Sequence, residues 1–212
     1  MKGRPRKSKP SRTARSVANA ARNTPSYRHV VLIGFMATGK STVGRLLARR
    51  LNLKFTDLDR EIEQQEGRTV PEIFRERGEP AFRRLERAMV RKFAARRGCV
   101  IATGGGVILS PANVRTLRAM GPVIELRSDP AVILRRIRVP GNRPLLDKNP
   151  RERIRGLLRL RIPLYTKAAD AVVNTSQFHP GRILGEIERA IADVVPRRFP
   201  VPPPTGAGRF PR

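Results

Sequence analysis

Apolar and polar positions follow two different rhythms along the middle of the chain. Short apolar runs such as "HVVLI" and "CVIA" have the length and β-branched content of buried strands. The longer segment "STVGRLLARRL" instead places Val43, Leu46, Leu47 and Leu51 on one helical face. On this basis we predict strands at 30–33, 53–57, 99–102, 122–126 and 171–174, and helices at 41–51, 59–66, 70–77, 79–97, 111–119, 130–138, 150–168 and 180–194.

Strands that alternate with helices indicate parallel strand pairing. Glycine or proline stands at most of the predicted joins, where each can end an element. A helix between successive strands allows the chain to cross back over the sheet, so we expect one layered α/β domain. In an open parallel sheet, ligands bind beyond the carboxyl ends of the strands. The residues that follow each predicted strand are therefore the first candidates for chemistry.

The two ends of the chain differ from this middle part. Residues 1–29 carry nine Lys or Arg, no acid and few large apolar groups, so they cannot bury enough surface to order themselves. Residues 196–212 are rich in proline and are expected to be extended or disordered. We predict a basic tail at 1–29, a folded domain at 30–195 and a proline-rich tail at 196–212.

The composition limits the class of protein. The 212 residues are 39% hydrophobic, and no run of about 18 apolar residues predicts a membrane span. Cys99 is the single cysteine, and a chain with one cysteine fits a reducing compartment. Because Cys99 lies in a predicted buried strand, we expect it to be a small core residue. The basic start shares its Arg and Ser content with transit peptides, but its Lys and Pro favour an untargeted tail and a cytoplasmic location.

The net charge of +28 indicates anionic partners without identifying them. Phosphorylated or carboxylated small molecules would be attracted, and so would nucleic acid, nonspecifically. Aromatic residues make up 5% of the chain and Trp is absent, so no stacking platform for single strands is evident. We expect no specific nucleic-acid partner and no membrane partner.

The stretch "LIGFMATGKST" carries the clearest chemical signal. Gly34, Gly39, Lys40 and Ser41 fit the pattern G-x-x-x-x-G-K-[ST] between a predicted strand and a predicted helix. Backbone amides of such a loop can curl around phosphate, the lysine can reach the terminal phosphates, and the serine hydroxyl can ligate Mg²⁺. The phosphate would also lie at a helix N-terminus, where free amides favour an anion.

Polar groups follow two further strands. Asp57 and Asp59, two residues apart, would project to the same side of an extended segment. Asp57 is a natural Mg²⁺ partner, and Asp59 could orient a hydroxyl or take its proton, although either could instead cap the next helix. The glycines 104–106 after the third strand would allow close approach of a ligand, or form a flexible turn.

The glycine- and proline-rich stretch "VPGNRPLLDKNP", residues 139–150, predicts a mobile lid. It carries Arg143. Arg83 in "AFRRLE" and Arg161 in "LRIPLY" could each fork onto a carboxylate, but among 45 Lys and Arg residues the pattern alone would not select them.

Taken together, the motifs resemble those of shikimate kinase, a small P-loop kinase of the nucleoside-monophosphate-kinase type. The matching stretches are "GFMATGKST", "DLDREIE", "IFRERGEPAFRRLE", "IATGGGV", "NRPLL" and "RIPLY", in the family's order over about residues 29–192. The resemblance implies a three-layer α/β/α fold with a five-stranded parallel sheet in the order 2-3-1-4-5. It also implies ATP-dependent phosphorylation of the 3-hydroxyl of shikimate, a step of chorismate and aromatic amino acid biosynthesis, by a monomer.

The resemblance assigns one set of residues to the nucleotide. Ser41 and Asp57 would hold Mg²⁺, Arg136 would stack on the adenine, and Arg143 of the lid would close over the phosphates. The phosphates themselves would be bound by the loop residues Ala37, Thr38, Gly39, Lys40, Ser41 and Thr42.

A second set would bind the acceptor. Asp59 would bind the shikimate hydroxyls and receive the proton, whereas Arg83, Arg161 and the Gly105 amide would hold the carboxylate. Lys40, Asp59 and Arg143 form the predicted catalytic group.

Two alternatives share this sequence pattern. A gluconate-type or nucleotide kinase would use the same fold and phosphate loop on another acceptor. The arginines favour an acceptor that carries a carboxylate, and the "RIPLY" segment favours shikimate over gluconate. A regulator could keep such a domain as a ligand sensor beside a DNA-binding module, but no DNA-reading motif is visible before residue 30.

Overall fold

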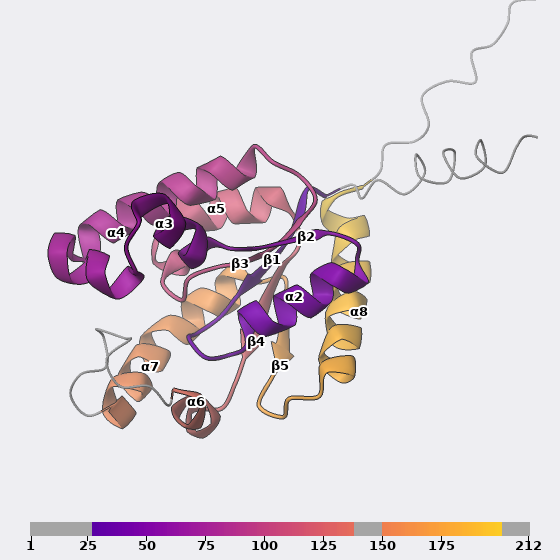
Figure 1. Ribbon diagram of the computed structural model, residues 1–212. Coiled ribbons are helices and arrows are strands. Elements are labelled where there is room, and N and C mark those ends of the chain that lie inside the picture. The colour runs from indigo at the N-terminus through magenta and orange to yellow at the C-terminus, as the bar shows by residue number, and fades with distance from the viewer. Residues whose placement is uncertain (1–26, 138–149, 201–212) are drawn as a thin grey trace, which may run out of the picture.

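The computed structural model describes residues 27–137 and 150–200, which build a five-stranded sheet between two layers of helices (Figure 1). Every strand pair is parallel, and the spatial order is β2-β3-β1-β4-β5. The predicted three-layer fold and its strand order are therefore confirmed. The strands are β1 (His29–Ile33), β2 (Lys54–Asp57), β3 (Cys99–Ala102), β4 (Val123–Arg127) and β5 (Ala171–Asn174).

The two faces of the sheet are covered by different helices. Helices α2 (Lys40–Arg50) and α8 (Pro180–Arg198) contact each other and pack on one face. The other face is covered by α3 (Leu58–Glu66), α4 (Val70–Ala94), α5 (Pro111–Met120), α6 (Pro130–Arg136) and α7 (Pro150–Ala168).

Strand β1 supplies both halves of the core because its side chains alternate between the two faces. Val30 and Leu32 pack with the α2 and α8 layer, whereas Val31 and Ile33 pack with the α3–α7 layer. All four side chains are fully buried, which explains why this strand appears as a continuous apolar run in the sequence. Cys99 is buried in the neighbouring strand, as its position in the sequence predicts.

The helices expected at 70–77 and 79–97 lie within α4 and meet at Gly78, whose non-helical dihedral angles confirm the predicted break. Two local features differ from the predicted elements. A short 3-10 helix, Val107–Leu109, follows the three glycines. Helix α8 continues to Arg198, past the expected domain limit at 195.

Tertiary contacts explain the length of α8. Arg198 donates a hydrogen bond to the buried carboxylate of Asp170 and another to the carbonyl of Arg118. Phe199 packs against Tyr27 with ring centroids 6.4 Å apart, so both ends of the described chain meet at the amino-terminal edge of the sheet. These contacts hold a helical end that the proline content of the sequence does not predict.

Within residues 27–137 and 150–200, no helix combines the length and apolar character needed to cross a membrane. The predicted lid at 139–150 lies outside the described residues except for position 150, where α7 begins. Arg143 of this lid is outside them as well.

Candidate active site

The loop between β1 and α2 adopts the backbone that its glycines permit. Gly39 has a φ of 93° at the start of α2, and Ala37 also lies in the left-handed region with a φ of 59°. Gly34 has a φ of 140°, and a Cβ atom there would lie 2.3 Å from the carbonyl oxygen of Leu126. The loop can therefore approach β4 closely only because position 34 has no side chain.

Lys40 lies inside this loop and is only 9% exposed. Its Nζ donates hydrogen bonds to the carbonyl oxygens of Gly34 at 2.9 Å and Phe35 at 2.8 Å. The loop thus holds the ammonium group among its own carbonyls, next to the space that the loop encloses. A cation placed in this way can attract a phosphate without first being ordered.

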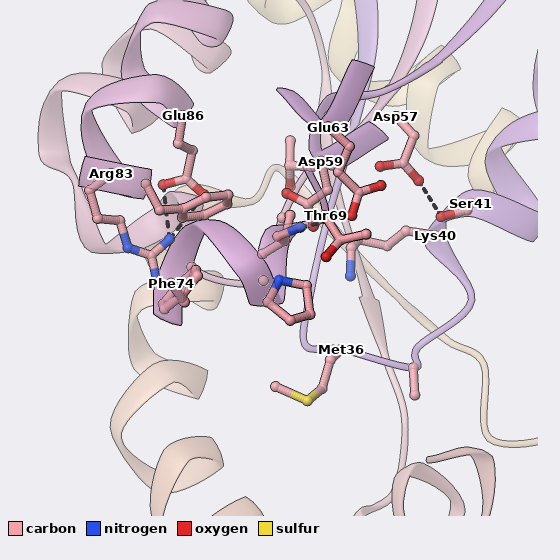
Figure 2. A pocket seen from close by; sticks show the side chains of 18 of the residues that line it. Met36, Lys40, Ser41, Asp57, Asp59, Glu63, Thr69, Phe74, Arg83 and Glu86 are labelled. Carbon is pink, nitrogen blue, oxygen red and sulfur yellow. Dashed lines mark hydrogen bonds and ion pairs between the residues drawn. The ribbon is translucent and has the colours of Figure 1, made fainter. Parts of the chain in front are cut away.

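Ser41 and Asp57 are joined across the carboxyl edge of the sheet. The Ser41 hydroxyl donates to Asp57 Oδ2 at 2.5 Å, although β3 lies between β1 and β2 (Figure 2). A hydroxyl and a carboxylate are oxygen ligands of the type that Mg²⁺ prefers. Among the described residues no group of three His, Cys, Asp or Glu could hold a metal alone, so the pair fits a cation that phosphate and water also ligate.

Asp59 lies between the Ser41–Asp57 pair and the Arg83–Glu86 pair (Figure 2). Its Oδ1 is enclosed and has no hydrogen-bond partner within the described part of the chain. A Cβ atom on Gly104 would lie 2.5 Å from that oxygen, so the glycine leaves it room. Burial, followed by the charge of Asp57 and opposed by Lys40, raises the pKa of Asp59 to about 6. An enclosed carboxylate without a partner can accept a hydrogen bond from a bound hydroxyl.

Arg83 is fixed by two carboxylates of its own helix, α4. Its guanidinium donates to Glu79 Oε1 at 2.8 Å and to Glu86 Oε2 at 3.0 Å. Glu86 is fully buried, and burial, opposed by Arg83, raises the pKa of its carboxyl to about 7. A Cβ atom on Gly106 would lie 2.3 Å from the guanidinium, which therefore lies against the backbone of the glycine loop.

Arg161 reaches the same region from α7 and is 6% exposed. Its guanidinium carbon lies 6.0 Å from the centre of the Phe35 ring, at the start of the phosphate loop. One turn further along α7, the buried Tyr165 donates its hydroxyl to the Gly105 carbonyl at 2.5 Å. Arg161 and Gly105 thus lie near each other although they are distant in the sequence.

These groups surround one cavity of about 400 Å³. It extends from the phosphate loop to the arginines and is closed on one side by the α3–α4 segment, including Phe74 and Phe82. A volume of this size suits a small metabolite beside a phosphoryl group. Of the residues predicted for the site, the cavity is lined by Ala37, Lys40, Ser41, Asp57, Asp59, Arg83, Gly105 and Arg161.

Arg136 lies on the other side of the phosphate loop. Its guanidinium donates to the carbonyl oxygens of Ala37 at 3.3 Å and Thr175 at 2.6 Å, and to Ser128 Oγ at 3.1 Å. The buried Thr175 in turn donates its hydroxyl to the Thr38 carbonyl at 2.8 Å. The ends of β4 and β5 therefore support the back of the loop. These bonds do not test the predicted contact between Arg136 and the adenine, which stays a prediction.

Sequence reasoning overlooked Glu86, which lines the cavity, and Tyr165, which bonds to the cavity-lining Gly105. Glu86 and Tyr165 stand within the matched stretches "FRRLE" and "RIPLY", yet neither had an assigned role. The signal for Glu86 was its spacing of three residues from Arg83 on a helix. No local pattern relates Tyr165 to Gly105, sixty residues away.

Comparison with known proteins decides between the kinases that share this geometry. The family model described as shikimate kinase matches residues 36–192, which is most of the chain. The chain belongs to the shikimate kinase family. Its matched motifs agree with this result, so the resemblance noted in the sequence is confirmed.

Individual relatives support the assignment. The shikimate kinase of Aromatoleum aromaticum is 46% identical over 163 residues, which cover 76% of this chain and 93% of the relative. The shikimate kinase of Thermus thermophilus is 50% identical over 141 residues, which cover 66% of this chain and 77% of the relative. The similarity therefore spans nearly the whole of the first relative.

Solved structures give the same family. A shikimate kinase from Acinetobacter baumannii, in complex with shikimate, superposes with a TM-score of 0.77 and 36% identity, over 82% of this chain and 97% of that one. A gluconokinase from Sinorhizobium meliloti superposes with a TM-score of 0.51 at 14% identity, over 82% of this chain and 97% of that one. The second similarity indicates a shared fold and no more.

Proposed function

We propose that the protein transfers the γ-phosphoryl group of ATP to the 3-hydroxyl of shikimate, giving shikimate 3-phosphate and ADP. Family membership supports the reaction. The observation that carries the acceptor assignment is the arrangement of Asp59 between the phosphate loop and two arginines that line the same cavity, the partly buried Arg83 and the buried Arg161. A single small acceptor with hydroxyls at one end and a carboxylate at the other matches this order of groups.

On the nucleotide side, the loop would bind the phosphates through the amides of residues 37–42 and the Lys40 ammonium. Lys40 needs only to exchange loop carbonyls for phosphate oxygens, which are stronger acceptors. Ser41 and Asp57 would hold Mg²⁺, which when bound neutralises phosphate charge during transfer. Arg136 would contact the adenine, and Arg143, outside the described residues, would contact the phosphates.

On the acceptor side, Asp59 would orient the hydroxyls and receive the proton of the one that attacks. Asp59 is suited to this task because its side chain lines the cavity beside the phosphate loop. Arg83 and Arg161 would hold the carboxylate, with Gly105 beside them. This division leaves positioning and charge neutralisation as the main sources of rate enhancement.

Acceptor choice tests the proposal. We expect ADP release from ATP and Mg²⁺ to depend on shikimate. Nucleoside monophosphates bring no carboxylate to Arg161, and a buried arginine without that partner loses about 3 kcal/mol, so their kcat/KM values should be at least about a hundredfold lower. Gluconate carries a carboxylate, so its kcat/KM should be lower only because its hydroxyls are placed differently beside Asp59. Faster turnover with gluconate would establish the gluconate-type alternative instead. Tight binding of shikimate without turnover would favour a ligand-sensing regulator.

The catalytic unit should be the domain predicted at 30–195, with the end of α8 to Arg198 as part of it, acting as a cytoplasmic monomer without a specific nucleic-acid partner. The reducing compartment is supported by the single, buried Cys99. Deletion of residues 1–26 would remove a basic segment that lies outside every matched motif, and we expect kcat/KM to stay within twofold. Sedimentation of the full chain and of the truncated chain, with and without DNA at two salt concentrations, would test the partner and oligomer assignments together.

A further inference from the structure

The Tyr165 side chain connects two parts of the acceptor site that arise from different segments. Its ring is buried against the core, with 1% of the residue exposed. The hydroxyl donates a hydrogen bond of 2.5 Å to the carbonyl oxygen of Gly105. Arg161 lies one turn earlier on the same helix, α7, and its guanidinium, which can only donate hydrogen bonds, lies beside the Tyr165 hydroxyl oxygen. One hydroxyl therefore contacts both the glycine loop and the arginine on α7.

The glycine loop is closely confined at this point. A Cβ atom on Gly105 would lie 3.4 Å from the Met36 amide nitrogen, 3.6 Å from the Tyr165 hydroxyl and 3.7 Å from the Gly34 carbonyl oxygen. Gly105 is thus packed between the beginning of the phosphate loop and Tyr165. A shift of this peptide would change the distance between the acceptor and the phosphate loop.

We propose that Tyr165 is a positioning residue that fixes Arg161 and the Gly105 peptide for the carboxylate of the acceptor. The proposal rests on the proposed function, since both partners are assigned there to carboxylate binding. Tyr165 acts through them and does not touch the substrate. The hydroxyl donates to Gly105 and lies beside the Arg161 guanidinium, so the guanidinium and the loop keep one relative orientation.

Burial raises the pKa of Tyr165 above its ordinary value, so the hydroxyl stays protonated and can donate at any working pH. A purely structural reason for the tyrosine also exists, because a buried phenol needs a polar partner in any protein. The two roles differ in their consequences. Loss of a structural bond lowers stability, whereas loss of a positioning bond raises the KM for one substrate and spares the other.

Tyr165→Phe removes the hydroxyl and keeps the ring. We expect the KM for shikimate to rise about five- to tenfold, which is the effect of about one lost hydrogen bond, with kcat and the KM for ATP within twofold. Tyr27→Phe is the matched control, since Tyr27 packs on Phe199 at the opposite edge of the sheet. An unchanged KM for shikimate in Tyr165→Phe would overturn the proposal.

A double-mutant cycle tests whether Tyr165 acts through Arg161. If it does, Tyr165→Phe should add little to the KM increase caused by Arg161→Ala. Multiplicative effects of the two substitutions would show independent roles and would contradict the inference.

A third measurement keeps the hydroxyl of Tyr165. The chain has two tyrosines, so fluorotyrosine incorporated into Tyr27→Phe labels Tyr165 alone. We expect its fluorine resonance to shift when shikimate saturates the site and to shift less with ADP. A resonance that shikimate leaves unmoved would also overturn the inference.

If the wild-type enzyme phosphorylates another acceptor, the proposed function fails, whereas normal shikimate turnover with unaffected Tyr165 variants would overturn only this inference.

Discussion

Ser41 and Asp57 form a hydrogen bond of 2.5 Å that links the first turn of α2 to the end of β2. The two residues stand sixteen positions apart, and the bond passes over the end of the intervening strand β3. It brings a hydroxyl and a carboxylate oxygen to one point beside the phosphate loop. This point is where a cation bound to the nucleotide phosphates would have both oxygens within reach.

Asp57→Asn should weaken the response of the enzyme to Mg²⁺. The amide removes one negative charge from the oxygen pair, so we expect the Mg²⁺ concentration at half-maximal rate to rise about tenfold or more, equivalent to about 1.4 kcal/mol. Titration of activity with Mg²⁺ at saturating ATP measures this value. Asp193→Asn on the exposed side of α8 is the control. An unchanged Mg²⁺ requirement in Asp57→Asn would exclude it from the metal site.

Lys40→Ala should lower kcat by about 10²–10³, because it removes a charge directed at the transferring phosphate. The fold should persist, since the Lys40 ammonium binds carbonyls of its own loop and the core strands and helices do not depend on these bonds. Lys54→Ala, at an exposed lysine at the start of β2, should leave kcat unchanged. Near-normal turnover of Lys40→Ala, with a circular dichroism spectrum like that of the wild type, would contradict the assigned role.

Asp59 should make the stability of the ligand-free protein depend on pH. Its pKa rises from 3.8 to about 6 on folding, so the folded chain binds this proton more tightly than the unfolded chain. The free energy of unfolding should therefore fall as the pH rises from about 4 to about 6. Asp59→Asn removes this loss, so its advantage in Tm over the wild type should be near zero at pH 4 and positive at pH 7.5.

Thermal unfolding at both pH values measures the effect, with Glu61→Gln on the same helix as the control. Asp59→Asn should also lose most of its kcat at pH 7.5, because the amide cannot accept the proton of the attacking hydroxyl. A Tm advantage that is equal at pH 4 and pH 7.5 would mean that Asp59 is already ionised in the folded protein at pH 4.

Arg161→Ala should raise the KM for shikimate about 10- to 100-fold, as expected for a lost charge-assisted contact of about 1.5–3 kcal/mol. The KM for ATP should change little. Arg161→Lys should restore binding only in part, because an ammonium cannot form the two-bond fork. Arg159→Ala, two positions earlier on the exposed side of α7, is the matched control. Damage to ATP binding with normal shikimate binding would move Arg161 to the nucleotide side.

The sequence predicts the parts of this site that depend on local pattern. A strand, a glycine loop, a lysine and a helix follow one another within residues 29–50, so periodicity and the phosphate-loop motif suffice to predict them. Asp57 and Asp59 were found because parallel strands end at the same edge. The predicted sheet order came from the family resemblance, since the strand pattern alone allows several orders.

Other parts depend on contacts between distant segments, which no local pattern contains. Arg83 and Arg161 are two among 45 Lys and Arg residues. The cavity that both line distinguishes them from surface arginines, and Arg161 is also buried. The bond between Tyr165 and Gly105 joins α7 to the loop after β3. Helix α8 passes Pro196 because Arg198 and Phe199 have partners at the far edge of the sheet.

The identity of the phosphorylated product tests the central claim most directly. Full-length protein would be incubated with ATP, Mg²⁺ and shikimate, and the product examined by phosphorus and proton nuclear magnetic resonance. We predict one molecule of ADP for each molecule of shikimate 3-phosphate, with negligible inorganic phosphate. Phosphate on a different hydroxyl, or ADP released with inorganic phosphate alone, would contradict the proposed placement of the 3-hydroxyl beside Asp59.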